Sequence, residues 1–387
     1  MAVTGARIPA LDGIRGLMAV VVMLWHGFLI VIPVVAVWVR QNATSPLAHA
    51  VSLIDPDILT QAIVVFFLVS GFVVSMPLLR EDRDWRRFYA SRLLRLYLPA
   101  WGAIALSVLL ILAVPRSTLP PGTWLADTNA TRVTLGEVLS DASLMSQRPL
   151  LDNPLWSLTW EVLFSLLLPL YVLVARLTRP HWLWAMGAVV LMSALSTELR
   201  LYPVAYMLSF LIGAIAAANA GKVMRAVAAI RRSSAHTLWW WLLFAGSLFS
   251  IGGYRLTQSL QLEKPFTLIN HVLASTTVVG YTGFLFLSVG AVSAERFFCT
   301  GIMRRSGAIS YSLYLIHVPI LATLAFAMPA AGGVAVLIGL PLSVVVAIAF
   351  ARWVEHPAHR FARRAGLRAA AATALRRRLD DESPTVP

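Results

Sequence analysis

Apolar runs of about 20 residues, the length that spans a bilayer, recur along this chain of 387 residues. About ten of them can be distinguished, near 17–39, 58–79, 98–114, 154–175, 182–197, 202–220, 237–253, 268–290, 309–328 and 333–354. Only 13% of the residues are charged, roughly half the share in soluble domains. A chain this long could bury a large core, so the apolar excess predicts contact with lipid. We expect an all-α, polytopic integral membrane protein of about ten transmembrane helices, which excludes a soluble enzyme, a disordered chain and a secreted disulfide scaffold.

The basic residues concentrate in alternate connecting segments. One alternating set, which includes both termini, holds 24 of the 32 Lys and Arg residues, and the other set holds 7. Positive residues accumulate in cytoplasmic loops, so both termini are predicted to be cytoplasmic. The first apolar run has no small-residue cleavage site behind it and is predicted to be a retained span. The net charge of +14 therefore follows the membrane edges and does not indicate nucleic acid.

Two units are expected: a membrane domain over residues 1–358 and a basic, flexible cytoplasmic tail over 359–387 that contacts anionic lipid. The longest outer segment, 115–153, is either a lid, an acceptor platform or a loop packed over the helix ends. Segment 84–97 is basic and aromatic, and it predicts a separate helix in the inner interface.

Metal and disulfide chemistry are not expected. The single cysteine, Cys299, excludes an internal disulfide. Glu355, His356 and His359 lie around a proline at the basic inner edge, and their pattern indicates a helix end rather than a metal site.

Ionisable residues inside membrane spans are costly, so each is a functional candidate. At 1.5 Å per residue, His26 lies about 16 Å from the inner face and Glu161 about 18 Å. Ser70 lies about 12 Å from that face, and His317 lies about 10 Å beyond Ser310. These groups, from four helices, share one band near mid-membrane.

Helical phase groups these residues further. Arg15 and His26 fall on one face of the first helix, and Ser157 and Glu161 share a face of the fourth. A third stripe consists of Ser310, Tyr314 and His317. Structural roles are the alternatives to functional ones. Trp156 could serve packing, Tyr314 could be an interfacial aromatic, and His317 could be a hydrogen-bonded core histidine.

Six segments, in order, resemble motifs of the bacterial membrane acyltransferase-3 family, which O-acylates sugars, peptidoglycan and some antibiotics. They are Arg15 with His26 ten residues later, Phe-Phe-Leu-Val-Ser-Gly-Phe at 66–72, Arg-Leu-Leu-Arg-Leu-Tyr-Leu-Pro at 92–99, Asn-Pro-Leu-Trp-Ser-Leu-Thr-Trp-Glu at 153–161, Ser-Tyr-Ser-Leu-Tyr-Leu-Ile-His at 310–317 and Glu-His-Pro at 355–357. The resemblance implies an acyl-CoA donor, commonly acetyl-CoA, a hydroxyl acceptor and ten core helices in the bacterial plasma membrane.

The residue chemistry suggests a role for each candidate. His26 is the candidate general base or transient acyl carrier. Glu161 would orient its imidazole or position the acceptor. The remaining candidates are expected to bind coenzyme A phosphates (Arg15, Arg92 and Arg95) or the thioester oxygen and the acceptor (His317, Ser70, Trp156, Ser157, Ser310 and Tyr314).

The acceptor stays open at this point. An envelope carbohydrate or glycolipid is the first hypothesis, and a macrolide-type antibiotic is the second. Other functions with the same polar groups are a transporter or flippase, for which inverted repeats are absent, and an electron carrier with haem between His26 and His317. The sequence does not indicate an oligomeric state.

Overall fold

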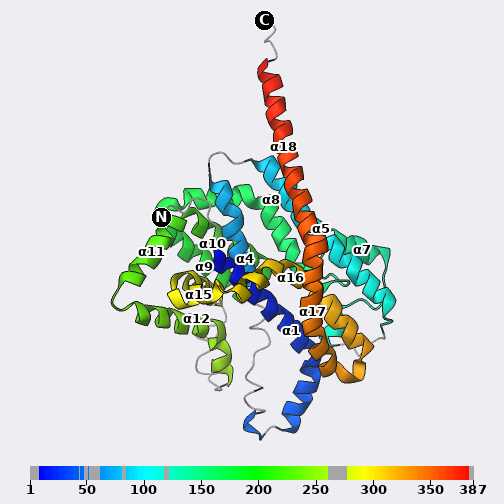
Figure 1. Cartoon of the computed structure of the whole chain (residues 1–387). Coiled ribbons are helices and arrows are strands. Elements are labelled where there is room, and N and C mark those ends of the chain that lie inside the picture. The colour runs from blue at the N-terminus through cyan, green and yellow to red at the C-terminus, as the bar shows by residue number, and fades with distance from the viewer. Residues whose placement is uncertain are drawn as a thin grey trace.

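The computed structural model describes residues 8–42, 44–47, 51, 62–80, 84–116, 122–259 and 277–382. All regular structure in these residues is helical (Figure 1). The helices in chain order are α1 (Pro9–Gln41), α4 (Ala62–Ser75), α5 (Trp85–Ala113), α6 (Trp124–Thr128), α7 (Leu135–Ala142), α8 (Trp156–Leu177), α9 (Trp182–Glu198), α10 (Tyr202–Ala218), α11 (Ala220–Arg232), α12 (His236–Ser259), α14 (Thr277–Gly290), α15 (Val292–Phe298), α16 (Gly301–Ala327), α17 (Gly332–Phe350) and α18 (His356–Glu382).

The expected all-α, multi-span fold is confirmed. Six helical stretches of the described chain are long and apolar enough to cross a membrane, and two bent pairs, α10 with α11 and α14 with α15, raise the number to eight at most. The predicted count of ten is not confirmed. Each apolar run contains a helix, but α9 and α12 are not among these candidates, and the starts of the runs near 58 and 268 lie outside the described residues.

Helix α5 differs from its prediction. Residues 84–97 do not form a separate interfacial helix, because α5 continues without a break through Pro99 to Ala113. Asp84 caps its N-terminus by accepting a hydrogen bond from the Arg87 N–H at 3.0 Å. Its 29 residues span about 44 Å, well beyond the hydrocarbon thickness. The continuous helix brings Arg92 and Arg95 alongside the other membrane helices.

The basic tail is helical as far as Glu382. A π-helical turn, Ala351–Glu355, joins α17 to α18, and α18 packs along α5 before projecting from the bundle (Figure 1). The boundary expected at residue 358 therefore falls inside a helix.

Helices α1 and α16 cross in backbone contact. A Cβ atom on Gly307 of α16 would lie 2.2 Å from the Asp12 carbonyl oxygen of α1, and one on Gly16 would lie 2.3 Å from Ser306 Oγ. Such separations admit only glycine, as at other close helix crossings in membranes. The crossing fixes the faces of the two helices that carry the candidate histidines.

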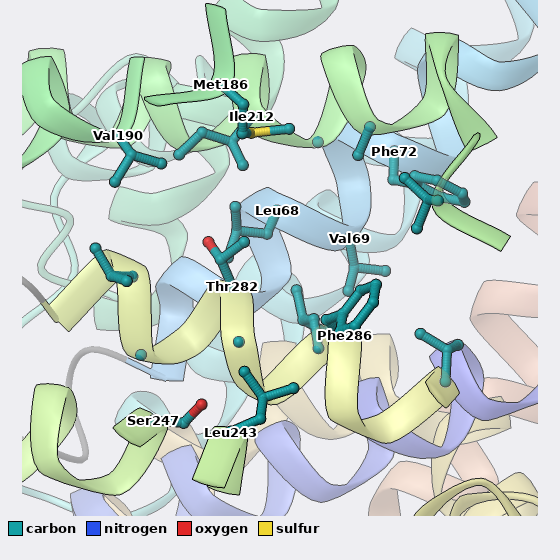
Figure 2. Close-up of a pocket in the computed structure, with 18 of the residues that line it drawn as sticks. Leu68, Val69, Phe72, Met186, Val190, Ile212, Leu243, Ser247, Thr282 and Phe286 are labelled. Carbon is teal, nitrogen blue, oxygen red and sulfur yellow. The ribbon is translucent and has the colours of Figure 1, made fainter. Parts of the chain in front are cut away.

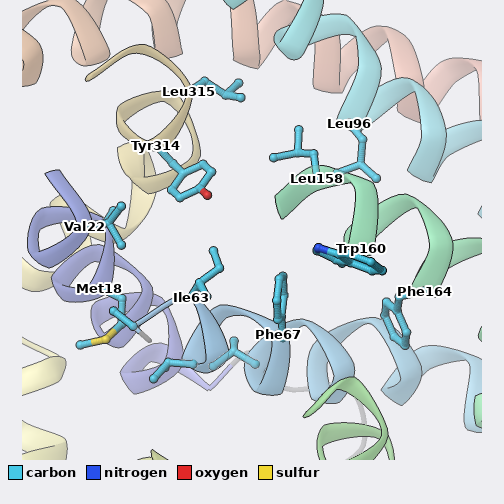
Figure 3. Packing of buried hydrophobic residues seen from close by; sticks show 14 of the residues in the cluster. Met18, Val22, Ile63, Phe67, Leu96, Leu158, Trp160, Phe164, Tyr314 and Leu315 are labelled. Carbon is cyan, nitrogen blue, oxygen red and sulfur yellow. The ribbon is translucent and has the colours of Figure 1, made fainter. Parts of the chain in front are cut away.

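Aromatic side chains fill the adjoining core. The Phe164 ring of α8 stacks on that of Phe210 in α10 at 4.3 Å, and Phe67 of α4 lies 4.6 Å from Phe210. Figure 3 shows Phe67, Phe164 and Tyr314 entering this region from three different helices. The packing holds α4, α8 and α16 around the polar groups described next.

Candidate functional site

A polar cavity of about 640 Å³ lies among α1, α4, α5, α8, α16 and the start of α18. It is lined by eight of the eleven candidate residues, namely Arg15, Ser70, Arg92, Arg95, Ser157, Glu161, Ser310 and Tyr314. Its volume falls within the range of small-molecule sites. The cavity therefore gathers polar groups that the sequence places more than 200 residues apart.

Glu161 lies at the centre of a hydrogen-bonded network in this cavity. Its carboxylate forms an ion pair with the Arg92 guanidinium and accepts a hydrogen bond from Ser70 Oγ at 2.9 Å. Arg92 also donates to Ser70 Oγ at 3.2 Å. The carboxylate is thus neutralised by α5, and the sequence hypothesis that it orients His26 has no contact to support it.

The other two cavity arginines are placed differently. Within the described residues, neither Arg15 nor Arg95 has an ion pair. Both line the cavity together with Glu355 and His359 from its α18 end. Sequence reasoning treated Glu355 and His359 only as a helix end. The π-helical turn before α18 is the feature that brings them inward, and such turns are frequent at functional sites.

Glu355 itself is buried and bonded. It accepts a hydrogen bond from Ser312 Oγ, and its other oxygen lies 3.7 Å from His359 Nδ1. The described residues contain no group of three or more His, Cys, Asp or Glu side chains arranged to hold a metal ion.

His26 and His317 form a second site, which does not line the cavity. His317 Nε2 lies 3.0 Å from His26 Nδ1. His317 Nδ1 lies 2.8 Å from the Leu313 carbonyl oxygen, and His26 Nδ1 lies 2.9 Å from that of Val22.

These contacts determine the protonation pattern of the neutral pair. Because a carbonyl oxygen only accepts, both Nδ1 atoms carry hydrogen. The single hydrogen of His26 Nδ1 is then shared between the Val22 carbonyl oxygen and His317 Nε2, and the lone pair of His26 falls on Nε2. Among the residues that the structure describes, His26 Nε2 has no hydrogen-bond partner, so it is the basic nitrogen of the pair that is left free.

Tyr314 lies next to both the cavity and His317. It lines the cavity, and its ring centroid lies 6.0 Å from that of His317. Its hydroxyl lies 2.6 Å from Ser157 Oγ and donates to the Pro154 carbonyl oxygen at 3.2 Å. Figure 3 shows this ring extending from α16 toward α8. The hydroxyl end of the ring is therefore held by Ser157 and by the turn before α8.

Trp124 of α6 packs beside His26 and was not foreseen from the sequence. Its ring centroid lies 5.2 Å from that of His26, and its neighbour Leu125 packs among Ala322 and Phe326 of α16. The described part of segment 115–153 thus packs against α16 at α6, in keeping with a loop packed over the helix ends, and the side of the membrane on which it lies stays a prediction. A tryptophan in a long polar loop carries no periodic signal that would have indicated this contact.

Two of the predicted site residues, Trp156 and Ser310, make contacts that are structural rather than catalytic in character. The Trp156 ring lies 5.7 Å from that of Tyr206 and does not line the cavity, in keeping with the packing alternative. Ser310 Oγ donates to the Gly307 carbonyl oxygen of its own helix at 2.9 Å.

Comparison with known proteins adds one finding. A family model described as an acyltransferase domain matches residues 8–352, nearly the whole chain. No curated protein and no solved structure matches the chain.

Proposed function

The chain belongs to the acyltransferase-3 family, and from that premise we propose that it moves an acyl group, in the first instance acetyl, from acyl-CoA to a hydroxyl of an envelope carbohydrate or glycolipid. The family match itself supports a membrane acyltransferase. The observation that carries the finer proposal is that an arginine-lined cavity and the histidine pair both lie next to the Tyr314 ring.

The arginine-lined cavity suits a donor that carries phosphates. Arg15 and Arg95 have no ion pair among the described residues and face the cavity, and guanidinium groups match phosphate geometry. Arg92 forms an ion pair with Glu161, so we assign both residues a structural role in shaping the cavity. By the charge distribution, this cavity opens toward the cytoplasm, where acyl-CoA is made.

Acyl transfer requires a base at the attacking hydroxyl. His26 Nε2 accepts the hydroxyl proton while the oxygen attacks the thioester carbon. The C–S bond then breaks as the tetrahedral intermediate collapses, and the imidazolium returns its proton to the thiolate. His317 fixes the tautomer of His26 and accepts a charge-assisted hydrogen bond from the imidazolium, so its role is positioning. An acyl-His26 intermediate is the alternative route.

The arrangement requires Tyr314 to move during each cycle. In this proposal, the thioester lies in the cavity that Tyr314 lines, and the ring stands between it and the histidine pair. Keeping the two apart until an acceptor binds protects the thioester from water.

The decisive experiment compares purified protein, reconstituted in lipid, with and without acceptor. Labelled acetyl-CoA supplies the donor, and mass spectrometry of envelope polysaccharide and secreted metabolites, with and without the gene, identifies the acceptor by its lost acyl mass. An unchanged metabolite and envelope profile, with no thioester turnover by the purified protein, would refute the proposal.

Replacing Arg95 or Arg15 by alanine should weaken donor use. Each loss removes a charge-assisted hydrogen bond worth about 1.5–3 kcal/mol, which corresponds to roughly ten- to a hundredfold in the apparent KM for acyl-CoA. Titration of acyl-CoA at saturating acceptor measures the effect. Arg364→Ala, on the part of α18 away from the cavity lining, is the matched control. Unchanged donor KM in both variants would remove the arginines from the donor site.

Tyr314→Ala should uncouple donor cleavage from transfer. Removing the ring joins the cavity to the histidines, so hydrolysis of acyl-CoA without acceptor is expected to rise severalfold while transfer falls. Tyr314→Phe keeps the ring and loses only the hydrogen bonds to Ser157 and Pro154, so its hydrolysis should stay near the wild-type rate. Free thiol release with and without acceptor distinguishes the two. Equal hydrolysis by Tyr314→Ala and wild type would show that the ring is no barrier.

A further inference from the structure

Two hollows among the described residues lie outside the polar cavity and differ in the charge of their linings. The larger, of about 660 Å³, is bounded mainly by α4, α9, α10, α11, α12 and α14 (Figure 2), and no charged residue of the described chain lines it. The other, of about 490 Å³, lies where α17 passes into α18 and is lined by Arg352, Trp353, His356, Pro357 and Arg360. A charged lining indicates the class of ligand, so only the second hollow identifies what it binds.

The three basic side chains of this hollow share one face of the helix. Arg352, His356 and Arg360 are spaced four residues apart and all three are exposed, so they follow one another along that face. Neither guanidinium has a hydrogen bond or an ion pair with another residue that the structure describes. Two positive charges therefore stand at the protein surface without a carboxylate to neutralise them.

The basic face continues the outward face of α17. Leu342, Val345 and Ile348 are exposed at intervals of three residues, and Arg352 comes four residues after Ile348. Helix α17 has 19 residues and belongs to a stretch that is apolar enough to cross a membrane. It spans about 28 Å, close to the hydrocarbon thickness of about 30 Å. Arg352 therefore lies where the apolar layer ends and lipid headgroups begin.

Trp353 supports this depth in the membrane. Its side chain is 72% exposed, and it lines the hollow beside Arg352. Tryptophan is enriched at the boundary between hydrocarbon and headgroups, because its ring is apolar and its indole N–H donates a hydrogen bond. The hollow therefore offers a headgroup one indole N–H and two guanidinium groups.

We propose that this hollow binds the headgroup of an anionic phospholipid, with Arg352 and Arg360 on either side of its phosphate and its acyl chains along the exposed face of α17. Guanidinium groups match phosphate geometry, and two arginines without a carboxylate favour a headgroup of net negative charge over a zwitterionic one. His356 also lines the polar cavity, so the lipid site adjoins the proposed donor site without sharing an arginine with it. Lipid binding here does not depend on the acyl-transfer reaction.

The experiment reconstitutes the full chain in nanodiscs of equal dioleoyl phosphatidylglycerol and dioleoyl phosphatidylcholine, extracts it in mild detergent and identifies the most tightly retained lipid by native mass spectrometry. We expect wild type to prefer phosphatidylglycerol about thirtyfold, the ratio that corresponds to about 1 kcal/mol for each of two arginines. Arg352→Gln with Arg360→Gln should bring the ratio close to one. Arg225→Gln with Arg232→Gln, two exposed arginines of α11 outside the hollow, is the matched control and should keep the wild-type ratio.

A crosslinking measurement tests the same site with both arginines in place. Trp353→p-benzoylphenylalanine puts a photoreactive group in the hollow, and it should label phosphatidylglycerol well above that lipid's share of the bilayer. The control is Trp241→p-benzoylphenylalanine in α12, a similarly exposed position that does not line the hollow, and its labelling should follow the bulk composition. Size exclusion and thermal unfolding check that each variant is folded.

A phosphate of the acyl-CoA donor is the rival occupant with the same chemistry. In nanodiscs of phosphatidylcholine alone, Arg352→Gln with Arg360→Gln should bind labelled coenzyme A with the wild-type Kd, and a tenfold loss would assign the hollow to the donor and overturn the proposal. Equal retention of both lipids by wild type would also overturn it. The same holds for a thirtyfold preference that persists in the double variant, or for labelling at Trp353 that only follows the bulk composition.

Discussion

Alanine in place of His26 is expected to lower the rate of acyl transfer by about 10²–10⁴-fold, the usual loss when a general base is removed. The loss will be larger if the acyl group passes through this imidazole. The physical reason is that His26 Nε2 is the free basic nitrogen of the histidine pair, while His317 Nε2 is occupied by the hydrogen bond from His26. Transfer from labelled acetyl-CoA by protein of matched purity measures the change.

Conservative variants distinguish a base from a structural side chain. His26→Gln keeps much of the size and hydrogen bonding but cannot take a proton, so it should be nearly as inactive as His26→Ala. His317→Ala should lower kcat and alter the dependence of kcat on pH, with little change in the donor KM. The reason is that His26 Nδ1 then loses its partner, so the hydrogen of His26 is no longer held on that nitrogen. Substantial transfer by a folded His26→Ala protein would make His317 the residue to test as the base.

Gly307→Val is expected to separate α1 from α16 and to abolish most activity together with stability. A Cβ atom at this position would lie 2.2 Å from the Asp12 carbonyl oxygen, and backbone cannot yield as a flexible side chain does. Overpacking costs about 1–3 kcal/mol and sometimes more, so we expect unfolding several degrees lower and little monodisperse protein. Fluorescence-detected size exclusion with a thermal ramp measures both quantities.

The same helix provides the control. Gly301 begins α16, and a Cβ atom there would meet nothing within 4 Å, so Gly301→Val should unfold close to the wild-type temperature. Should the two valine variants unfold at the same temperature and transfer equally, the close crossing would not be what holds the two histidines together.

Much of the fold could be predicted because lipid imposes a strong pattern on sequence. Apolar runs locate the helices, and depth along each helix locates polar groups: Ser70 and Glu161, placed in one band by counting residues, do share a hydrogen bond. The count of spans was less predictable, since α11 and α15 bend away from their neighbours at breaks of a few residues.

The partners within the site could not be predicted by depth alone. Glu161 was expected to face His26, but its partner is Arg92, which the sequence placed on a separate interfacial helix. Arg92 reaches Glu161 because α5 continues without a break. The sequence between residues 84 and 99 does not indicate whether this segment forms one continuous helix or two separate helices. The contact between His26 and His317 depends on the rotation of α1 against α16, which Gly16 and Gly307 set through packing rather than through periodicity.

The position of the Tyr314 ring also matters for the ion permeability of the membrane. A water-accessible cavity with three arginines that reached through to the outer segment would offer ions a path across the bilayer, and each turnover would drain the gradient that energises the cell. Tyr314 lines the polar cavity and is bonded to Ser157 and to the Pro154 carbonyl oxygen, so we expect its ring to close the cavity on the side of His317. Under the proposed function, an acyl group a few atoms long would need only a brief displacement of that ring, so a covalent group could cross the membrane without opening a continuous path for ions.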